Sequence, residues 1–167
     1  TFFATCAVLL LCLSACANMA PLVSHPPDLT FDHIPEIRLN IASIDIVDQY
    51  KPPMQAPHVE HLLTSPLYES VHRLVAHQFV AGGAQDRLVV TIEDASIISK
   101  PLPRKEGVAG ALTQEVSERY DGRAVVRVAL YRDGQPDAVA GWVEATAERS
   151  SMLFEDMTPA ERERLLF

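Results

Sequence analysis

Two histidines and a carboxylate stand close together in the sequence His58-Val59-Glu60-His61. Side chains of these types are ligands that zinc accepts in proteins. In an extended segment, however, His58 and His61 do not share a face in the way that i, i+4 histidines on a helix do. We therefore interpret this stretch as a solvated loop and expect no metal site.

A second candidate for chemistry is the adjacent carboxylate pair Glu93-Asp94. Neighbouring residues on a strand point to opposite faces, so this pair would converge on one substrate only at a bulge. We favour a turn at the end of a strand. The sequence has no Gly-x-Ser-x-Gly motif, and its glycine pairs lack the lysine of phosphate-binding loops. We therefore expect no catalytic residues, no cofactor and no enzymatic activity.

The residues with the clearest chemical meaning are Leu13-Ser14-Ala15-Cys16, which follow an apolar run that begins at Phe2. They resemble the lipobox of bacterial lipoproteins. In such proteins a diacylglycerol is attached to the cysteine thiol, a signal peptidase cuts before that cysteine, and the new amine is usually acylated. Two or more acyl chains anchor a protein stably to a bilayer. We expect Cys16 to carry such an anchor.

The apolar run is shorter than the about 20 residues that a transmembrane helix needs, and it has the length of the apolar part of a signal peptide. The first lysine or arginine is Arg38, so we interpret residues 1–15 as a signal peptide that lacks its charged start. A buried N-terminal helix is disfavoured because prolines follow closely. Cleavage would remove Cys6 and Cys12, which leaves no thiol to pair with in a disulfide.

Composition narrows the choice of partners. The net charge is −8, and the apolar run contributes nothing to it. An acidic protein is unsuited to sequence-independent nucleic-acid binding and is repelled by anionic surfaces. We expect a membrane, through the anchor at Cys16, and an envelope protein as partners, with a lipid as a further candidate ligand and no nucleic acid.

Residues 16–36 carry four prolines and no regular pattern, which is typical of a flexible tether. The roughly 130 residues that follow, 37–167, suffice for one domain with one core. Alternating or β-branched runs predict four strands there. Their ranges are 37–46, with a bulge near Ala42-Ser43, then 88–98, 123–131 and 139–147. The residues Arg132-Asp133-Gly134-Gln135 predict a hairpin turn between the last two strands.

Two helices are predicted. Ser65 followed by Pro66 predicts the start of the first, with Ser65 as its N-cap. Its apolar spacing continues to Phe79, and Gly82-Gly83 predict its end. The stretch Thr158-Pro159-Ala160-Glu161 is a capping box that predicts a second helix, still continuing where the sequence stops.

The order β-α-β-β-β-α predicts an α+β fold with an antiparallel sheet of about four strands and two helices packed on one face. We expect the core to use one face of each strand and of the first helix. Its predicted members are Leu39, Ile41, Leu74, Phe79, Val90, Ile92, Val126, Val128 and Val143. Trp142 has the opposite parity to Val143, so we expect it at the sheet edge or against a partner.

The connection from Lys100 to Val116 is far longer than a hairpin needs, and loops of this length are usually functional or disordered. It sets the cationic Arg104 and Lys105 beside a small-apolar stretch that contains Val108 and Leu112. This combination suits an anionic headgroup or an acidic partner surface. We expect these four residues, together with Trp142, to contact a partner or a membrane, with simple disorder as the competing interpretation.

Together, the lipobox, tether, element order and long loop resemble a family of small envelope lipoproteins. These are the auxiliary lipoproteins of ABC-type intermembrane transport systems and the lipopolysaccharide-assembly lipoprotein. The local resemblance lies in the strand start Glu118–Val125, the Asp133-Gly134 turn and the last strand Ala140–Arg149. It implies an outer-membrane lipoprotein facing the periplasm, a binding or scaffolding subunit in lipid or lipopolysaccharide transport. Ala17 favours the outer membrane, because inner-membrane lipoproteins of some bacteria carry aspartate there.

Two other functions stay open. The first is a structural lipoprotein that stabilises another envelope complex, and the second is a hydrolase of cell wall or lipid, which needs converging polar side chains. An apolar groove between sheet and helices would favour lipid handling, whereas a flat exposed strand edge would favour partner scaffolding.

Overall fold

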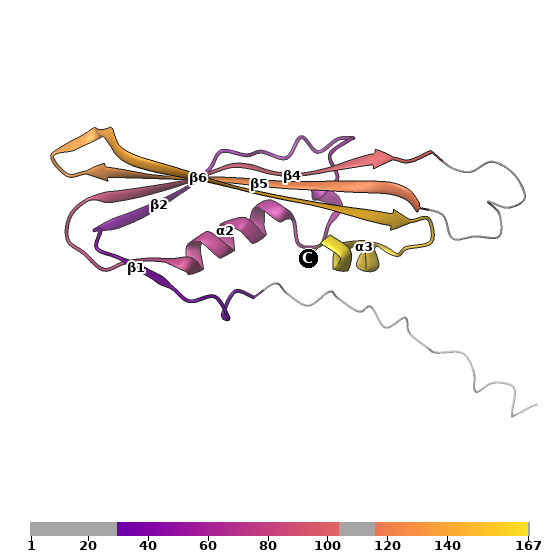
Figure 1. The fold of residues 1–167 in the computed structure, drawn as a ribbon, viewed down its shortest axis with the longest axis horizontal. Coiled ribbons are helices and arrows are strands. Elements are labelled where there is room, and N and C mark those ends of the chain that lie inside the picture. Colours follow the sequence, from indigo (N-terminus) through magenta and orange to yellow (C-terminus); the bar gives the residue numbers. More distant parts are fainter. Residues whose placement is uncertain (1–29, 104–115, 167) are drawn as a thin grey trace, which may run out of the picture.

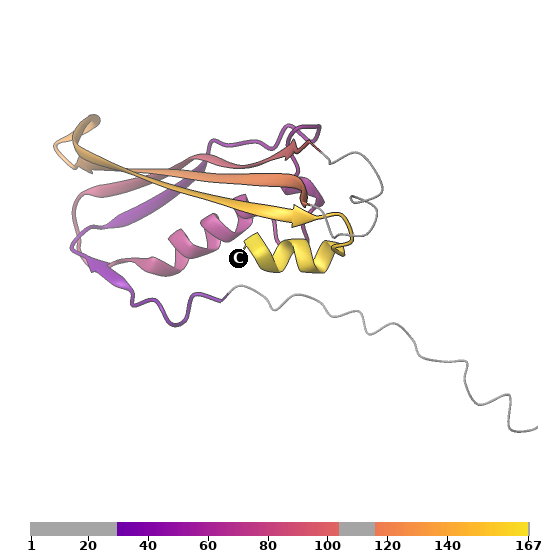
Figure 2. The same ribbon diagram turned by 45° about the vertical axis from the view of Figure 1, so that its right-hand side comes forward.

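The computed structural model describes residues 30–103 and 116–166, which form a long sheet with helices beneath it (Figure 1). The elements are β1 (Ile37–Leu39), β2 (Ser43–Asp48), the short 3-10 helix η2 (Glu60–Leu62), α2 (Leu67–Gln78), β3 (Phe79–Ala81), β4 (Arg87–Pro101), β5 (Val116–Arg132), β6 (Gln135–Phe154) and α3 (Pro159–Leu166). Both α2 and α3 lie on the same face of the sheet (Figure 2), so the predicted α+β fold is confirmed.

The main sheet has the strand order β2-β4-β5-β6. Its last three strands form the predicted antiparallel meander, and the two-residue turn Asp133-Gly134 joins β5 to β6, with Arg132 paired to Gln135. The pair β2–β4 is parallel, so the prediction of a wholly antiparallel sheet is wrong at this edge. The reason is that α2 and β3 carry the chain back to the end where β2 began, as a crossover between parallel strands requires.

The first predicted strand is two strands in two sheets. β1 pairs in parallel with β3, whereas β2 joins the main sheet, so the predicted bulge near Ala42-Ser43 is instead the passage from one sheet to the other. Gly83 makes this passage possible, because its N–H donates to the Ile41 carbonyl at 2.9 Å. A Cβ atom on Gly83 would lie 2.6 Å from the Asn40 carbonyl carbon, which is too close for any other residue.

The boundaries of α2 differ from the prediction at both ends. Ser65 does not cap the helix with its side chain, and its N–H donates instead to the Glu163 carboxylate of α3 at 2.7 Å. At the other end the helix stops at Gln78 and not at Gly82-Gly83, because the next three residues pair as β3. Both corrections have the same cause, which is that partners distant in sequence satisfy these backbone groups.

The capping box of α3 is confirmed. The Thr158 N–H donates to the Glu161 carboxylate at 2.8 Å, and the Glu161 N–H donates to Thr158 Oγ1 at 3.4 Å. The Thr158 N–H and, after it, the Thr158 hydroxyl, which donates to the same carboxylate at 2.8 Å, hold the pKa of Glu161 below its ordinary value. No helix in the described part of the chain is both long and apolar enough to cross a bilayer.

The core consists of two clusters along the helix side of the sheet. One lies over α2 and contains Ile41, Val71, Val75, Leu88, Val90, Ile92 and Ala95. The other joins η2, α3 and the far end of the sheet and contains Val59, Ile97, Tyr120, Leu153 and Leu166. Three predicted core residues are buried, namely Ile41, Val90 and Ile92, while Leu39, Leu74, Phe79, Val126 and Val128 are half-buried.

Val143 is the one wrong member of the predicted core. Its side chain has the predicted parity, because it pairs with Val128, yet it is 61 % exposed. The physical reason is that α2 packs mainly under β4, and α3 reaches only the last part of β6. The middle of β6 therefore has no helix packed against either of its faces within the described residues.

Candidate functional site

The most unusual feature of the structure is the exposure of β6. Every described side chain from residue 137 to 150 is exposed, although the strand is 20 residues long and pairs with β5 along its whole length. Three of the exposed side chains are large and apolar, namely Val139, Trp142 and Val143. Among the described residues no strand pairs with the other edge of β6.

The opposite edge of the sheet is formed by β2 and, beyond it, by a segment that pairs with β4. Where β2 ends, the segment before η2 continues along β4, with the Ser99 N–H donating to the Pro57 carbonyl at 2.9 Å. The Val59 N–H donates to the Ile97 carbonyl, also at 2.9 Å, and an isolated antiparallel bridge forms between these two bonds. Proteins usually protect sheet edges in this way, because an open edge invites pairing with other chains. β6 is the longer of the two edge strands of the described sheet, with 20 residues against six in β2.

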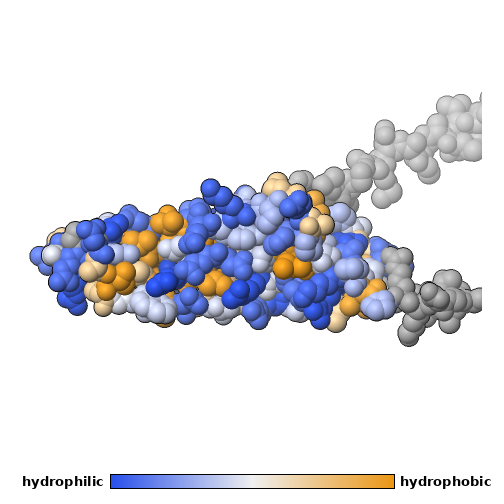
Figure 3. Space-filling view, turned by 90° about the horizontal axis from the view of Figure 1, so that it is seen from above, coloured by the Kyte–Doolittle hydropathy of each residue, from blue (hydrophilic) through white to orange (hydrophobic). Residues whose placement is uncertain are grey.

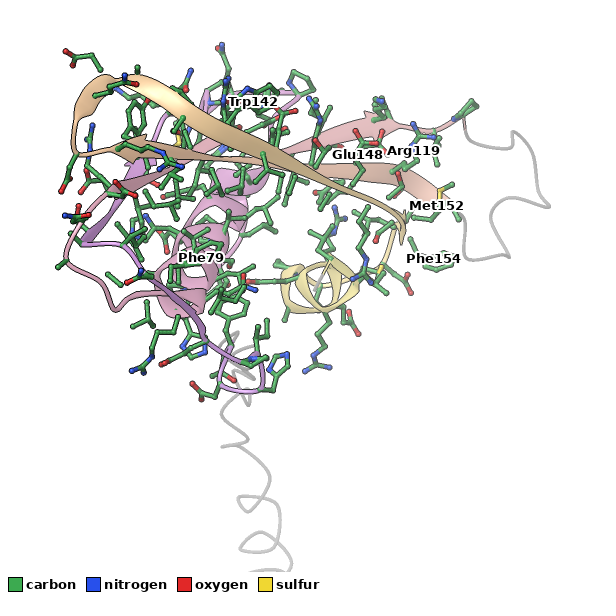
Figure 4. All side chains as sticks on the ribbon, turned by 60° about the vertical axis from the view of Figure 1, so that its left-hand side comes forward. Phe79, Arg119, Trp142, Glu148, Met152 and Phe154 are labelled. Atoms are coloured by element: carbon green, nitrogen blue, oxygen red, sulfur yellow. The ribbon has the colours of Figure 1, made fainter. Side chains whose placement is uncertain are left out.

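The two faces of β6 differ in chemistry. The face toward the helices carries Gly141, Val143, Ala145 and Ala147, as the pairing of β6 with β5 requires. The outer face carries Trp142, which lies on the opposite side of the ribbon from the helices in Figure 4. The alternation therefore places an apolar row on one side of β6. On the other side, Trp142 is followed by the polar residues Glu144, Thr146 and Glu148.

Trp142 was predicted to lie at the sheet edge or against a partner, and it lies on the edge strand with 60 % of its surface exposed. The Arg127 guanidinium stacks over its ring, 4.4 Å from the ring centre. Such a cation–π contact orients an exposed indole without covering it. Trp142 is therefore held in a defined position with its free side open to a partner.

The rest of the outer face is mostly hydrophilic, as Figure 3 shows. On this face the Asp121 carboxylate lies 2.8 Å from Lys100 Nζ and 2.9 Å from Arg119, and it accepts a hydrogen bond from Ser150 at 2.7 Å. Lys100, Ser150 and Arg119 together hold the pKa of Asp121 far below its ordinary value, Lys100 having the largest effect. These contacts lock the carboxylate between cations, which suits a structural role.

The Glu93-Asp94 pair lies inside β4 and not at a strand end, so that prediction is wrong. A bulge between Ile92 and Asp94 shifts the pairing with β5. The bulge lets both carboxylates reach arginines of β5: Glu93 lies 3.9 Å from Arg127, and Asp94 lies 3.5 Å from Arg123. Each carboxylate is thus matched to its own cation.

The stretch from His58 to His61 is not the solvated loop that we predicted. Glu60 is fully buried at the start of η2, where it accepts hydrogen bonds from the Tyr50 hydroxyl and, at 3.2 Å, from the Ile97 N–H. His58 Nδ1 lies 3.4 Å from the same carboxylate. Burial, followed by the bond to Glu60, raises the pKa of Tyr50. This cluster fastens the segment to β4, and no group of metal-binding side chains occurs in residues 30–103 and 116–166.

A small cavity lies beside β6 on the helix side of the sheet. Its volume is about 130 Å³, and its lining is mostly apolar. Leu67, Ile97, Ala124, Ala147 and Leu166 form the apolar part, and Arg123, Glu148 and Arg149 also line it. Both helices line it, through Leu67 in the first turn of α2 and Leu166 in the last turn of α3. It is a small version of the groove between sheet and helices that would favour lipid handling. Ala147 belongs both to the cavity and to the exposed row of β6.

The other predicted site residues are Cys16, Arg104, Lys105, Val108 and Leu112. All five lie outside the described residues, so the lipid anchor and the loop contact stay predictions. Sequence reasoning missed that both faces of β6 are exposed. The signal of this exposure was the run of small residues on both parities, alanine at positions 138, 140, 145 and 147, because such a strand offers little side-chain area to a core.

We compared the chain with known proteins. No model of a known protein family matches the sequence, and a search of curated proteins also finds no match. The resemblance to envelope lipoproteins therefore rests on the sequence features described above, and no family membership is assigned.

Proposed function

We propose that this protein is a lipid-anchored, non-enzymatic envelope lipoprotein that serves as an auxiliary or scaffolding subunit in lipid or lipopolysaccharide transport. Its anchor is Cys16, and its site of action is the periplasmic face of the outer membrane. The lipobox-like residues support the anchor, and the resemblance to envelope lipoproteins supports the pathway. The alternative, a structural lipoprotein that stabilises another envelope complex, differs from this proposal only in the partner.

The single observation that carries a scaffolding role is the open edge of β6. Proteins blunt such edges with lysine, proline, bulges or a covering segment. Residues 138–147 contain neither lysine nor proline, have a single charged residue, Glu144, and are covered by no described segment. An edge that is this long, apolar and unprotected is the surface on which proteins add a strand from a partner.

A hydrolase finds less support in the candidate clusters. The Glu60 carboxylate is buried and accepts structural hydrogen bonds, and Glu93 and Asp94 are each paired with an arginine. A general acid or base must instead reach the proton of a bound substrate. These carboxylates are therefore better explained as parts of the scaffold.

Site-specific photocrosslinking in cells that make the full-length protein tests the function. A photoreactive residue at position 142 should capture a component of a lipid- or lipopolysaccharide-export complex. The same residue at position 73, on the exposed side of α2, should not. Capture of an envelope protein without a role in lipid export would favour the structural alternative. Capture of nothing from position 142 would contradict the scaffolding role.

A further inference from the structure

We propose that the partner binds β6 as an added β-strand in which basic residues alternate with aliphatic residues. This inference rests on the proposed scaffolding function and names the chemistry of the segment that the edge accepts. The basic residues lie on the outer face of the extended sheet, and the aliphatic residues lie on the face toward α2 and α3. Three features of β6 carry the inference: its free backbone groups, its charge and its apolar row.

The first feature is the backbone. In an antiparallel pair, the N–H and C=O groups of every second residue point toward the neighbouring strand, and those of the other residues point away from it. Because β6 pairs only with β5, half of its backbone groups between residues 137 and 150 are directed to the open edge. An extended segment satisfies these groups with main-chain hydrogen bonds, whereas a helix cannot.

The second feature is the charge of the outer row. Glu148 lies 3.3 Å from Arg123, but Arg123 is shared with Asp94. Glu144 is exposed and forms no ion pair with any described residue, because Arg127, its neighbour on β5, is directed to Glu93 and Trp142. The edge therefore carries an excess of negative charge. Oppositely charged residues on adjacent strands stabilise the pairing, so lysine or arginine is favoured on this face of the partner.

The same charges argue against a second copy of this chain as the occupant. A β6 strand paired with the β6 strand of another molecule would bring two rows containing Glu144 and Glu148 side by side. Like charges on adjacent strands are destabilising. The net charge of −8 adds a repulsion between whole molecules. A basic partner avoids both costs.

The third feature is the row toward the helices. Gly141, Val143, Ala145 and Ala147 are apolar and short, so they leave room for larger side chains on a neighbouring strand. The cavity beside Ala147 has a mostly apolar lining, although Arg123, Glu148 and Arg149 also border it. Its volume of about 130 Å³ is similar to that of cavities of about 150 Å³ that take up benzene. An aliphatic side chain of the added strand can fill it as an anchor, in the way that central hot spots do.

Tryptophan fluorescence tests the proposal directly, because Trp142 is the only tryptophan in the sequence and lies on the binding edge. The probe is a capped peptide of about ten residues, a usual strand length, in which lysine alternates with valine. Two matched peptides are compared with it: one has glutamate in place of lysine, and the other has lysine and valine rearranged to a helical period. We expect saturable binding of the first peptide only.

Two variants assign the preference to the edge. The double variant Glu144→Gln with Glu148→Gln should weaken binding of the lysine peptide roughly fivefold, as the loss of two cross-strand ion pairs implies. The matched double variant Glu36→Gln with Glu69→Gln removes two exposed carboxylates outside the main sheet and should bind normally. Val143→Lys puts a charge on the apolar row and should abolish binding while circular dichroism shows an intact fold.

Several results would overturn the inference. These are no binding of the lysine peptide, equal binding of the glutamate peptide, stronger binding of the helical-period peptide, or dimers of the free protein that Val143→Lys dissociates. Failure here is distinguishable from failure of the proposed function. A partner captured from position 142 through an acidic or helical segment refutes the basic strand but keeps the scaffolding role, whereas no capture refutes the scaffolding role itself.

Discussion

At the scale of single residues, the polar side chains with the fewest exposed atoms are structural fasteners. Glu60 has no exposed surface and accepts hydrogen bonds from the Tyr50 hydroxyl and the Ile97 N–H, which ties the segment before α2 to the edge of β4. Glu163 is almost as deeply buried and accepts the N–H groups of Thr64 and Ser65. Glu163 thus satisfies backbone groups of a segment without regular pairing, and Glu60 satisfies a backbone N–H at the edge of β4.

Replacement of Glu60 by alanine should lower the free energy of unfolding by about 3 kcal/mol, because it leaves a buried N–H and a hydroxyl without an acceptor. Tyr50→Phe should cost less, about 1–2 kcal/mol, because the carboxylate keeps the Ile97 N–H as a donor. Urea unfolding measures both. As a control, Asp48→Asn removes an exposed partner of His72 and should change stability by less than about 0.5 kcal/mol. Equal effects of all three variants would contradict the fastening role of Glu60.

The contacts of Asp121 predict a dependence of stability on pH. Lys100, then Ser150 and Arg119, hold the pKa of Asp121 in the folded protein below its ordinary value of 3.8. A lowered folded pKa means that the carboxylate stabilises the fold above about pH 4. This stabilisation is lost as the pH falls through the lowered pKa.

The variant Asp121→Asn lacks the stabilisation by the ionised carboxylate at every pH, so acidification cannot remove it. Its urea midpoint should therefore be lower than that of the natural protein at pH 7, and the gap should narrow as the pH is taken from about 5 to about 2. A gap of constant size across this range would show that the ionised form of Asp121 does not matter for stability.

At the scale of elements, the small β1–β3 sheet connects the N-terminal segment to the end of α2. β1 and β3 pair over three residues each, and the chain passes from there into β2 of the main sheet. The approach is closest at Gly83, where the backbone of Asn40 and Ile41 occupies the space that a side chain would need. One missing Cβ atom therefore decides where the first strand divides.

Gly83→Ala should destabilise the protein by about 2 kcal/mol, because a Cβ atom there meets backbone that has little freedom to move. Gly141→Ala is the matched control, since a Cβ atom on Gly141 has nothing within 4 Å. That variant should change stability by less than about 0.5 kcal/mol. Thermal unfolding of the two variants checks the difference, and an equally stable Gly83→Ala protein would mean that the passage between the sheets adapts easily.

At the scale of the whole molecule, two helices share one long sheet without covering all of it. α2 and α3 each pack over one core cluster, and the middle of β6 lies beyond both of them. If Cys16 is anchored as proposed, the open edge is presented to partners close to a membrane. The concentration of binding sites at that surface compensates for modest affinity of a single strand.

The anchor itself is tested with Cys16→Ser in the protein expressed behind a complete lipoprotein signal segment. We expect this variant to fold, because the predicted tether of residues 16–36 separates residue 16 from the domain. It should stay unlipidated and uncleaved, retained at the membrane by its signal segment. Intact-mass analysis distinguishes the forms, and a normal mature N-terminus in the variant would contradict the role of Cys16.

Local patterns in the sequence were sufficient for features that neighbouring residues decide. The Asp133-Gly134 turn, the capping box from Thr158 to Glu161 and the meander of three strands are all confirmed. The turn and the capping box depend on bonds within a few residues, and each strand of the meander shows its alternation locally. The lipobox-like residues before Cys16 have the same local character, although their outcome stays a prediction.

Only the tertiary structure decided which faces and edges are covered. The alternation of β6 is the same for a covered strand and an open one, so Val143 had the right parity for the core and the wrong surroundings. The sequence predicted a solvated Glu60, because its neighbours Tyr50 and Ile97 are brought to it only by the fold. Burial depends on the sum of all neighbours, including those far away in the chain. For that reason the candidate binding edge became visible only when the helices and the opposite edge had their positions.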